Sequence, residues 1–162
     1  MRGLVRGLGA LAVVWAVLVV AAPWLATVPA VGGTYLSASA YGFGALVCHQ
    51  RPERSFHLAG AQLPVCARCT GLYLSAAVGI LFAWARRRSS PVPFANWRAC
   101  LLWAALPTAA TLLFEWWRPS GASGAVRAVA AVPLGAAAGA LLAGTVGFRS
   151  KLHGCDRTRH GR

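Results

Sequence analysis

The stretch Cys66–Arg88, CARCTGLYLSAAVGILFAWARRR, contains a C-x-x-C pair, a long apolar run and three consecutive arginines. A helix needs roughly 20 apolar residues to cross about 30 Å of hydrocarbon, and this run has about that length. A helix is the expected spanning element because it satisfies its own backbone hydrogen bonds. The stretch therefore predicts a membrane-spanning helix that begins at a pair of thiols.

Three further apolar blocks occur along the chain, which has 162 residues of which only 12% are charged. Soluble domains carry about 25% charged residues, so lipid is the expected solvent. The predicted spans are residues 8–27, 65–85, 99–117 and 126–148. Residues 34–47 are too short to span and predict an interfacial or re-entrant helix. We predict an all-α polytopic membrane protein, a four-helix transmembrane bundle with this short helix in the first outer loop.

The distribution of basic residues predicts the orientation and the domain boundaries. Eleven of the 16 Lys and Arg residues lie on the side of the N-terminus, in segments 2–6, 86–98 and 149–162. The positive-inside rule then predicts a multi-pass protein of the cell membrane with both termini in the cytoplasm. Residues 1–148 are expected to form one transmembrane domain, and residues 149–162 a disordered basic tail.

The net charge of +13 also bears on partners. The cations cluster at helix ends, so anionic phospholipid headgroups at the cytoplasmic face are the expected partners, and nucleic acid is not. No protein partner follows from the sequence. A cleaved signal peptide is the alternative for the first block, although its apolar run exceeds the 7–15 residues of a usual signal. Cleavage would leave three spans.

Three cysteines and two histidines occur within residues 48–69, on the predicted outer side. Disulfide pairing of Cys48, Cys66 and Cys69 would leave one thiol over, which calls for another explanation. Three cysteines and one histidine are a known ligand set of structural zinc sites. We therefore predict a metal site, with zinc the expected metal and either His49 or His57 as the fourth ligand.

Two other functions stay open at this point. Cys66 and Cys69 are the candidate catalytic residues of a membrane thiol–disulfide oxidoreductase, since the outer compartment favours disulfides. Arg51, Arg54 and Arg68 suit a phosphate or carboxylate, which indicates an anion or lipid-headgroup site and a lipid-phosphate binding or processing protein. Headgroup contact or ion pairing by interfacial arginines is the simpler and preferred interpretation of these residues. Whether the chain is an enzyme does not follow from these residues.

Glu115 is the one acidic residue inside a predicted span, near its outer end. Acids at such depth are paired or functional. We predict an ion pair with Arg68, Arg51 or Arg118, and the alternative is a hydrogen-bond acceptor behind a metal ligand or a proton-handling group.

The fourth block contains Gly135-x-x-x-Gly139. Small residues at this spacing let two helices approach closely. Packing within one bundle is expected here, and dimerisation is the alternative.

The segments CHQRPERSF (Cys48–Phe56) and PVCARCTGLY (Pro64–Tyr73) together resemble the paired signature of the membrane-protein family known as domain of unknown function 2085. The resemblance covers about residues 34–85 and implies no particular activity. It implies that the signature positions are Cys48, His49, Gln50, Arg51, Arg54, Ser55, Phe56, Cys66, Arg68, Cys69, Thr70, Gly71 and Tyr73.

His49 lies within this signature and His57 does not, so His49 is the preferred fourth ligand. Neighbouring residues on a regular helix point about 100° apart. Cys48 and His49 therefore both bind one metal ion only if the backbone turns sharply between them. Without such a turn, His57 or water is the better fourth ligand.

Overall fold

The computed structural model describes residues 2–27, 31–86, 96–118 and 121–156. These residues form five α-helices: α1 (Arg2–Thr27), α2 (Val31–Val47), α3 (Ala67–Arg86), α4 (Trp97–Trp117) and α5 (Gly124–Asp156). Between α2 and α3 the chain forms the short 3-10 helix η1 (Pro52–Arg54) and an antiparallel hairpin of β1 (His57–Leu58) and β2 (Ala61–Gln62).

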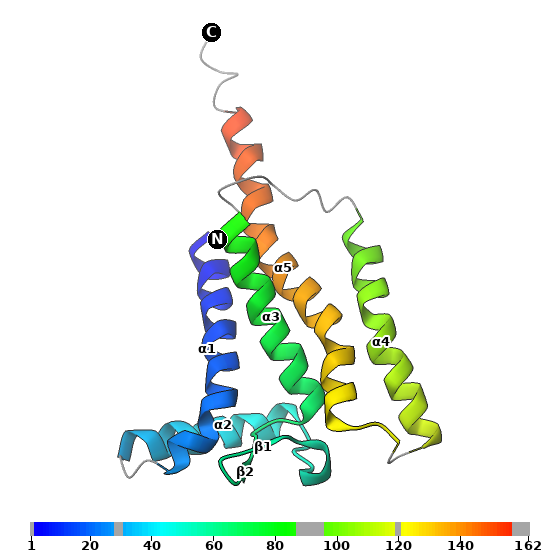
Figure 1. Ribbon diagram of the computed structural model, residues 1–162. Helices are drawn as coiled ribbons and strands as arrows, with labels where there is room; N and C mark the ends of the chain where they lie inside the picture. Colours follow the sequence, from blue (N-terminus) through cyan, green and yellow to red (C-terminus); the bar gives the residue numbers. More distant parts are fainter. Residues whose placement is uncertain (1, 28–30, 87–95, 119–120, 157–162) are drawn as a thin grey trace.

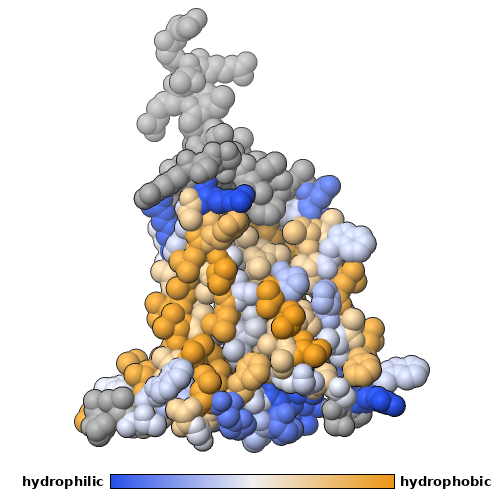
Figure 2. Space-filling view, in the orientation of Figure 1, coloured by the Kyte–Doolittle hydropathy of each residue, from blue (hydrophilic) through white to orange (hydrophobic). Residues whose placement is uncertain are grey.

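Four of the described helices are long and apolar enough to cross a membrane: Gly3–Thr27, Ala67–Arg86, Trp97–Trp117 and Gly124–Ala143. They run up and down the molecule, while α2 lies across the end at which α3 and α5 begin (Figure 1). The space-filling view shows an apolar belt with polar side chains at both ends (Figure 2). The predicted all-α, multi-pass class, with a short helix after the first span, is confirmed.

The helix boundaries differ from the predicted ones at several points. α3 begins at Ala67, so Cys66 precedes the helix and Cys69 lies in its first turn. α5 continues to Asp156, which means that no break in the helix marks the boundary predicted after residue 148. The domain boundaries therefore stay predictions. Residues 87–95 of the loop before α4 and residues 157–162 of the predicted tail lie outside the described residues.

Glycines hold α3 and α5 together in the largest helix–helix interface among the described elements. A Cβ atom on Gly71 of α3 would overlap the carbonyl oxygen of Ala128, and one on Gly139 of α5 would overlap that of Ala76. Gly135 packs in the same way against Leu72. Close backbone contact drives helix association in lipid, where apolar surface alone gives no preference for protein. The predicted packing of Gly135 and Gly139 inside the bundle is confirmed.

α4 lies at the edge of the bundle, beside α5 (Figure 1). Of the residues of α4, all of which are described, only Glu115 is buried. Polar contacts attach the helix to α5: the Thr108 hydroxyl donates a hydrogen bond of 2.8 Å to the carbonyl oxygen of Ala130. α4 therefore leaves most of its apolar side chains exposed and turns Thr108, Thr111 and Glu115 toward α3 and α5.

Candidate metal centre

Three sulfur atoms meet where α2 ends and α3 begins. Cys48 follows α2, Cys66 directly precedes α3, and Cys69 lies in the first turn of α3. Their Sγ atoms all lie within 4.8 Å of one another. Each cysteine is partly buried and free of a disulfide. The structure thus brings together the three cysteines of the predicted site.

Two glutamines hold the loop that positions this group. The Gln50 side chain donates hydrogen bonds of 2.8 Å to the carbonyl oxygen of Tyr41 and 2.7 Å to that of Pro64. Gln62 in turn donates to the carbonyl oxygen of Gln50 at 2.6 Å. Gln50 has a φ of 45°, in the left-handed region that side-chain-bearing residues rarely adopt. The two glutamines thereby tie the segment that follows α2 to the residues just before α3.

The sulfurs also bond to one another and to the backbone. The Cys66 backbone N–H donates to the Cys48 Sγ at 3.2 Å. A hydrogen bond with the Cys69 side chain, with a smaller contribution from Cys48, lowers the pKa of the Cys66 thiol although partial burial opposes the shift. The thiolate is the form of cysteine that binds metals and attacks disulfides. The group can therefore supply at least one ready ligand.

An apolar cluster covers the group on the side of the bundle. Val19 of α1 and Leu63 and Val65 of the loop are fully buried there, and Cys48 and Cys69 pack against them. Trp15 and Tyr73 close this cover, with ring centroids 6.1 Å apart in an edge-to-face arrangement. Such surroundings keep water from one side of the sulfurs and strengthen electrostatic interactions with them.

The histidines lie elsewhere. His49 is exposed, and His57 is exposed on β1. Among the described residues, no histidine, aspartate or glutamate joins the three sulfurs. The fourth ligand, His49 or His57, therefore stays a prediction.

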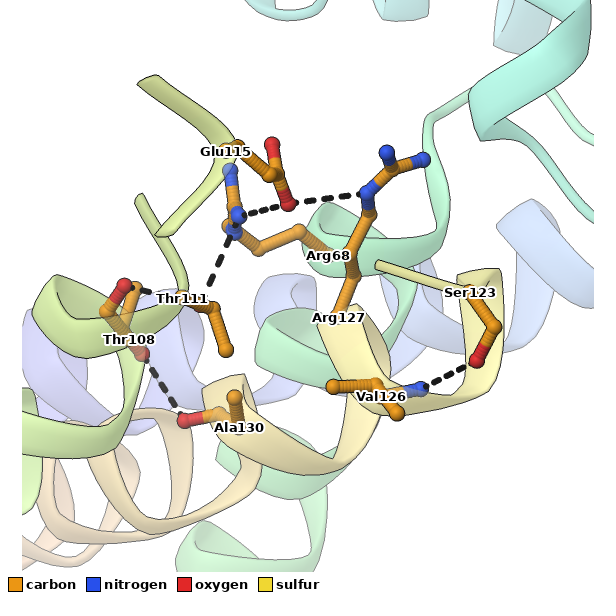
Figure 3. Close-up of polar contacts among 8 residues, drawn as sticks. All are labelled: Arg68, Thr108, Thr111, Glu115, Ser123, Val126, Arg127 and Ala130. Carbon is orange, nitrogen blue, oxygen red and sulfur yellow. Dashed lines mark hydrogen bonds and ion pairs between the residues drawn. The ribbon is translucent and has the colours of Figure 1, made fainter. Parts of the chain in front are cut away.

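Glu115 lies in a group of charges that links three helices. Its Oε1 accepts a hydrogen bond from Arg68 of α3 at 2.8 Å and another from Arg127 of α5 at 2.9 Å (Figure 3). Arg68 is one of the predicted partners. Arg51 and Arg118 are exposed and form no ion pair with a described residue.

Arg127 is the member of this charge group that the sequence reasoning did not pair with Glu115. It is buried in the first turn of α5. The available signal was an arginine within the predicted span 126–148, because a charge inside a span needs a partner. Arg54 of η1 is partly buried, and the structure does not group it with Arg68, so the anion site of Arg51, Arg54 and Arg68 stays a prediction.

Comparison with known proteins places these features in a family. Similar proteins include an uncharacterized protein of Methanocaldococcus jannaschii, 43% identical over 47 residues, which are 29% of this chain and 30% of that protein. Another, from Methanothermobacter thermautotrophicus, is 50% identical over 38 residues, 24% of this chain and 34% of the relative. The chain thus matches about a third of the length of these relatives.

No solved structure matches the chain. The family model described as predicted membrane protein (DUF2085) matches residues 48–141, from the first cysteine of the three-sulfur group into α5. This range covers more than half of the 162 residues and includes both sequence motifs. The chain belongs to the DUF2085 family of membrane proteins.

Proposed function

We propose that this membrane protein holds a metal ion at Cys48, Cys66 and Cys69, with zinc the preferred ion. The observation that carries the proposal is the convergence of three Sγ atoms within 4.8 Å of one another. Zinc–sulfur bonds of about 2.3 Å place the sulfurs of one site roughly 4 Å apart, so binding needs only a small contraction. His49 is the proposed fourth ligand, with His57 as the alternative.

The role we propose for this site is structural or partner-binding. Cys48 directly follows α2, whereas Cys66 directly precedes α3 and Cys69 lies in its first turn. One ion bound to all three would tie the helix that lies across the bundle to a membrane span. Structural sites of this kind contribute directly to folding free energy.

We propose further that the site faces the outside of the cell membrane. The supporting observation is the bias of basic residues toward the opposite end, where Arg86 ends α3 and Arg98 begins α4, both exposed. Both termini would then lie in the cytoplasm. Exposed arginines at that end would contact anionic phospholipid headgroups.

The metal proposal predicts a defined stoichiometry. Protein purified without chelator is expected to carry about one zinc ion per chain, and Cys48→Ser is expected to lower its zinc affinity at least about tenfold because a sulfur ligand is lost. Elemental analysis and thiol counts before and after chelation measure both quantities. Cys100→Ser is the matched control, since Cys100 is an exposed free cysteine on α4.

The outcome that contradicts the metal site is equally defined. A protein without metal that contains a reducible Cys66–Cys69 bond would instead support the thiol–disulfide alternative. Equal metal content in Cys48→Ser and in the unsubstituted protein would also exclude the proposed ligand set.

The orientation predicts which exposed positions are reached from outside. In a Cys100→Ser background, a maleimide that cannot cross membranes is expected to label Glu53→Cys on intact cells, because Glu53 is exposed in η1. Arg98→Cys, exposed at the start of α4, is expected to react only after lysis. The reverse pattern would place the sulfurs in the cytoplasm.

A further inference from the structure

The charges around Glu115 do not balance. Two guanidinium groups share the single carboxylate oxygen Oε1, which leaves one positive charge over. The side chains of Arg127 and Glu115 are each 7% exposed, and that of Arg68 is 21% exposed. A buried charge without a counter-charge is costly.

The chain has no other acid that could supply the missing charge. Its three acidic residues are Glu53, Glu115 and Asp156. Glu53 is exposed in η1 and forms no ion pair with a described residue. Asp156 ends α5, which puts it roughly 40 Å from Arg127 along the helix at 1.5 Å per residue.

The helix ends that meet here do not supply the missing negative charge either. Arg68 and Arg127 lie in the first turns of α3 and α5, whereas Glu115 lies in the last turn of α4. A helix N-terminus carries a partial positive charge and a C-terminus a partial negative charge. Two N-termini and one C-terminus meet here, so the helix dipoles make the potential at this group more positive.

Several donors of the two arginines point to no acceptor. The Nε of Arg68 is buried and has no hydrogen-bond partner in the described part of the chain. Arg127 bonds to Glu115 through Nε alone, and its two terminal nitrogens point away from the carboxylate (Figure 3). A guanidinium offers paired donors in a fixed fork that matches the oxygens of a phosphate or carboxylate.

We propose that Arg68 and Arg127 bind an oxyanion of the phosphate class, which supplies the counter-charge that no second described carboxylate provides. The group lies where three spans begin or end, at the boundary between apolar belt and polar end, and therefore at headgroup level. A lipid headgroup phosphate and free phosphate share the required chemistry. Arg127 thereby replaces Arg51 and Arg54 as the partner of Arg68 in anion binding.

Thermal unfolding of the full-length protein, delipidated in a nonionic detergent, tests this site at constant ionic strength. Replacing chloride with inorganic phosphate, or adding phosphatidylglycerol, is expected to raise Tm by about 5 °C or more near saturation. Monoolein, which has no phosphate, is expected to have no effect. Stabilisation by inorganic phosphate identifies a site for the free anion, and stabilisation by phosphatidylglycerol alone identifies a lipid site; either result supports the proposal.

Two variants separate this site from general surface charge. Arg127→Gln leaves a balanced Arg68–Glu115 pair and is expected to lose the anion-dependent rise in Tm. Arg118→Gln, which removes an exposed arginine just after α4, is expected to keep it.

The proposal is overturned if the unsubstituted protein shows no anion dependence, or if Arg118→Gln loses the rise as fully as Arg127→Gln does. An equal rise in Arg127→Gln and the unsubstituted protein would also overturn it. If Arg127→Gln does not fold, Arg127→Lys takes its place, because it keeps the charge but not the fork and is expected to weaken the anion response severalfold. If the anion-dependent rise in Tm is as large in Arg127→Lys as in the unsubstituted protein, the proposal is overturned.

Discussion

Glu115→Gln is expected to destabilise the protein by about 3–5 kcal/mol, the usual cost of removing one partner from a buried ion pair. Both arginines lose the carboxylate oxygen that they share, at 2.8 and 2.9 Å. Glu115 is also the one buried residue of α4, all of whose residues are described. Loss of the Glu115 carboxylate therefore weakens the attachment of α4 to the bundle and also leaves the charges of Arg68 and Arg127 unpaired.

Thermal unfolding in detergent, followed by tryptophan fluorescence, measures this effect. A change of this size corresponds to a fall in Tm of roughly 10 °C for a chain of this length. Glu53→Gln is the matched control, since Glu53 is exposed and a surface change is expected to stay within about 0.5 kcal/mol. If both variants unfold at the same temperature, the ion pairs do not stabilise the bundle.

Gly139→Ala is expected to destabilise the α3–α5 interface by about 1–3 kcal/mol or more, the range for overpacking a close contact. The added methyl group would overlap the carbonyl oxygen of Ala76, which belongs to the rigid backbone of α3 and cannot turn aside. The two helices would have to separate along their closest line of contact, and lipid would not restore the lost packing.

Gly7→Ala on α1 provides the control with the opposite sign. A Cβ atom at Gly7 has no neighbour within 4 Å among the described atoms, so the change adds no strain. Alanine favours the helix over glycine by up to about 1 kcal/mol, and slight stabilisation is expected. If Gly7→Ala destabilises the protein as much as Gly139→Ala does, the close contact of Gly139 with α3 is not the cause of the destabilisation.

The spans and α2 were predictable because each rests on a local run of apolar residues. The hairpin of β1 and β2 was not, since its strands have two residues each and carry no alternating pattern. Its turn places Ala59 at φ 52° and Gly60 at φ 77°. Gly60 is the only residue of this hairpin whose type indicates a turn. A positive φ at an alanine such as Ala59 is a conformation that the sequence does not predict.

The candidate site was predictable in part. Cys66 and Cys69 are three residues apart in the sequence, so their proximity follows from this spacing. Cys48 was included in the predicted site because a disulfide between two of the three thiols would leave one over. The exposed position of His49 does not follow from residue spacing, and neither does the φ of 45° at Gln50, which side-chain-bearing residues rarely adopt. Likewise, Arg127 reaches Glu115 only because α4 packs on α5, a tertiary contact that hydropathy does not encode.

The position of α4 has a consequence for the order of membrane insertion. α3 and α5 share the largest helix interface, yet α4 separates them in the chain. As the chain is synthesised, α3 enters the bilayer before α5 exists, and the surface around Gly71 meets lipid in the meantime. α5 then delivers both Gly139 and Arg127. The helix contact and the charge group are therefore both completed when α5, which follows α3 and α4 in the chain, enters the bundle.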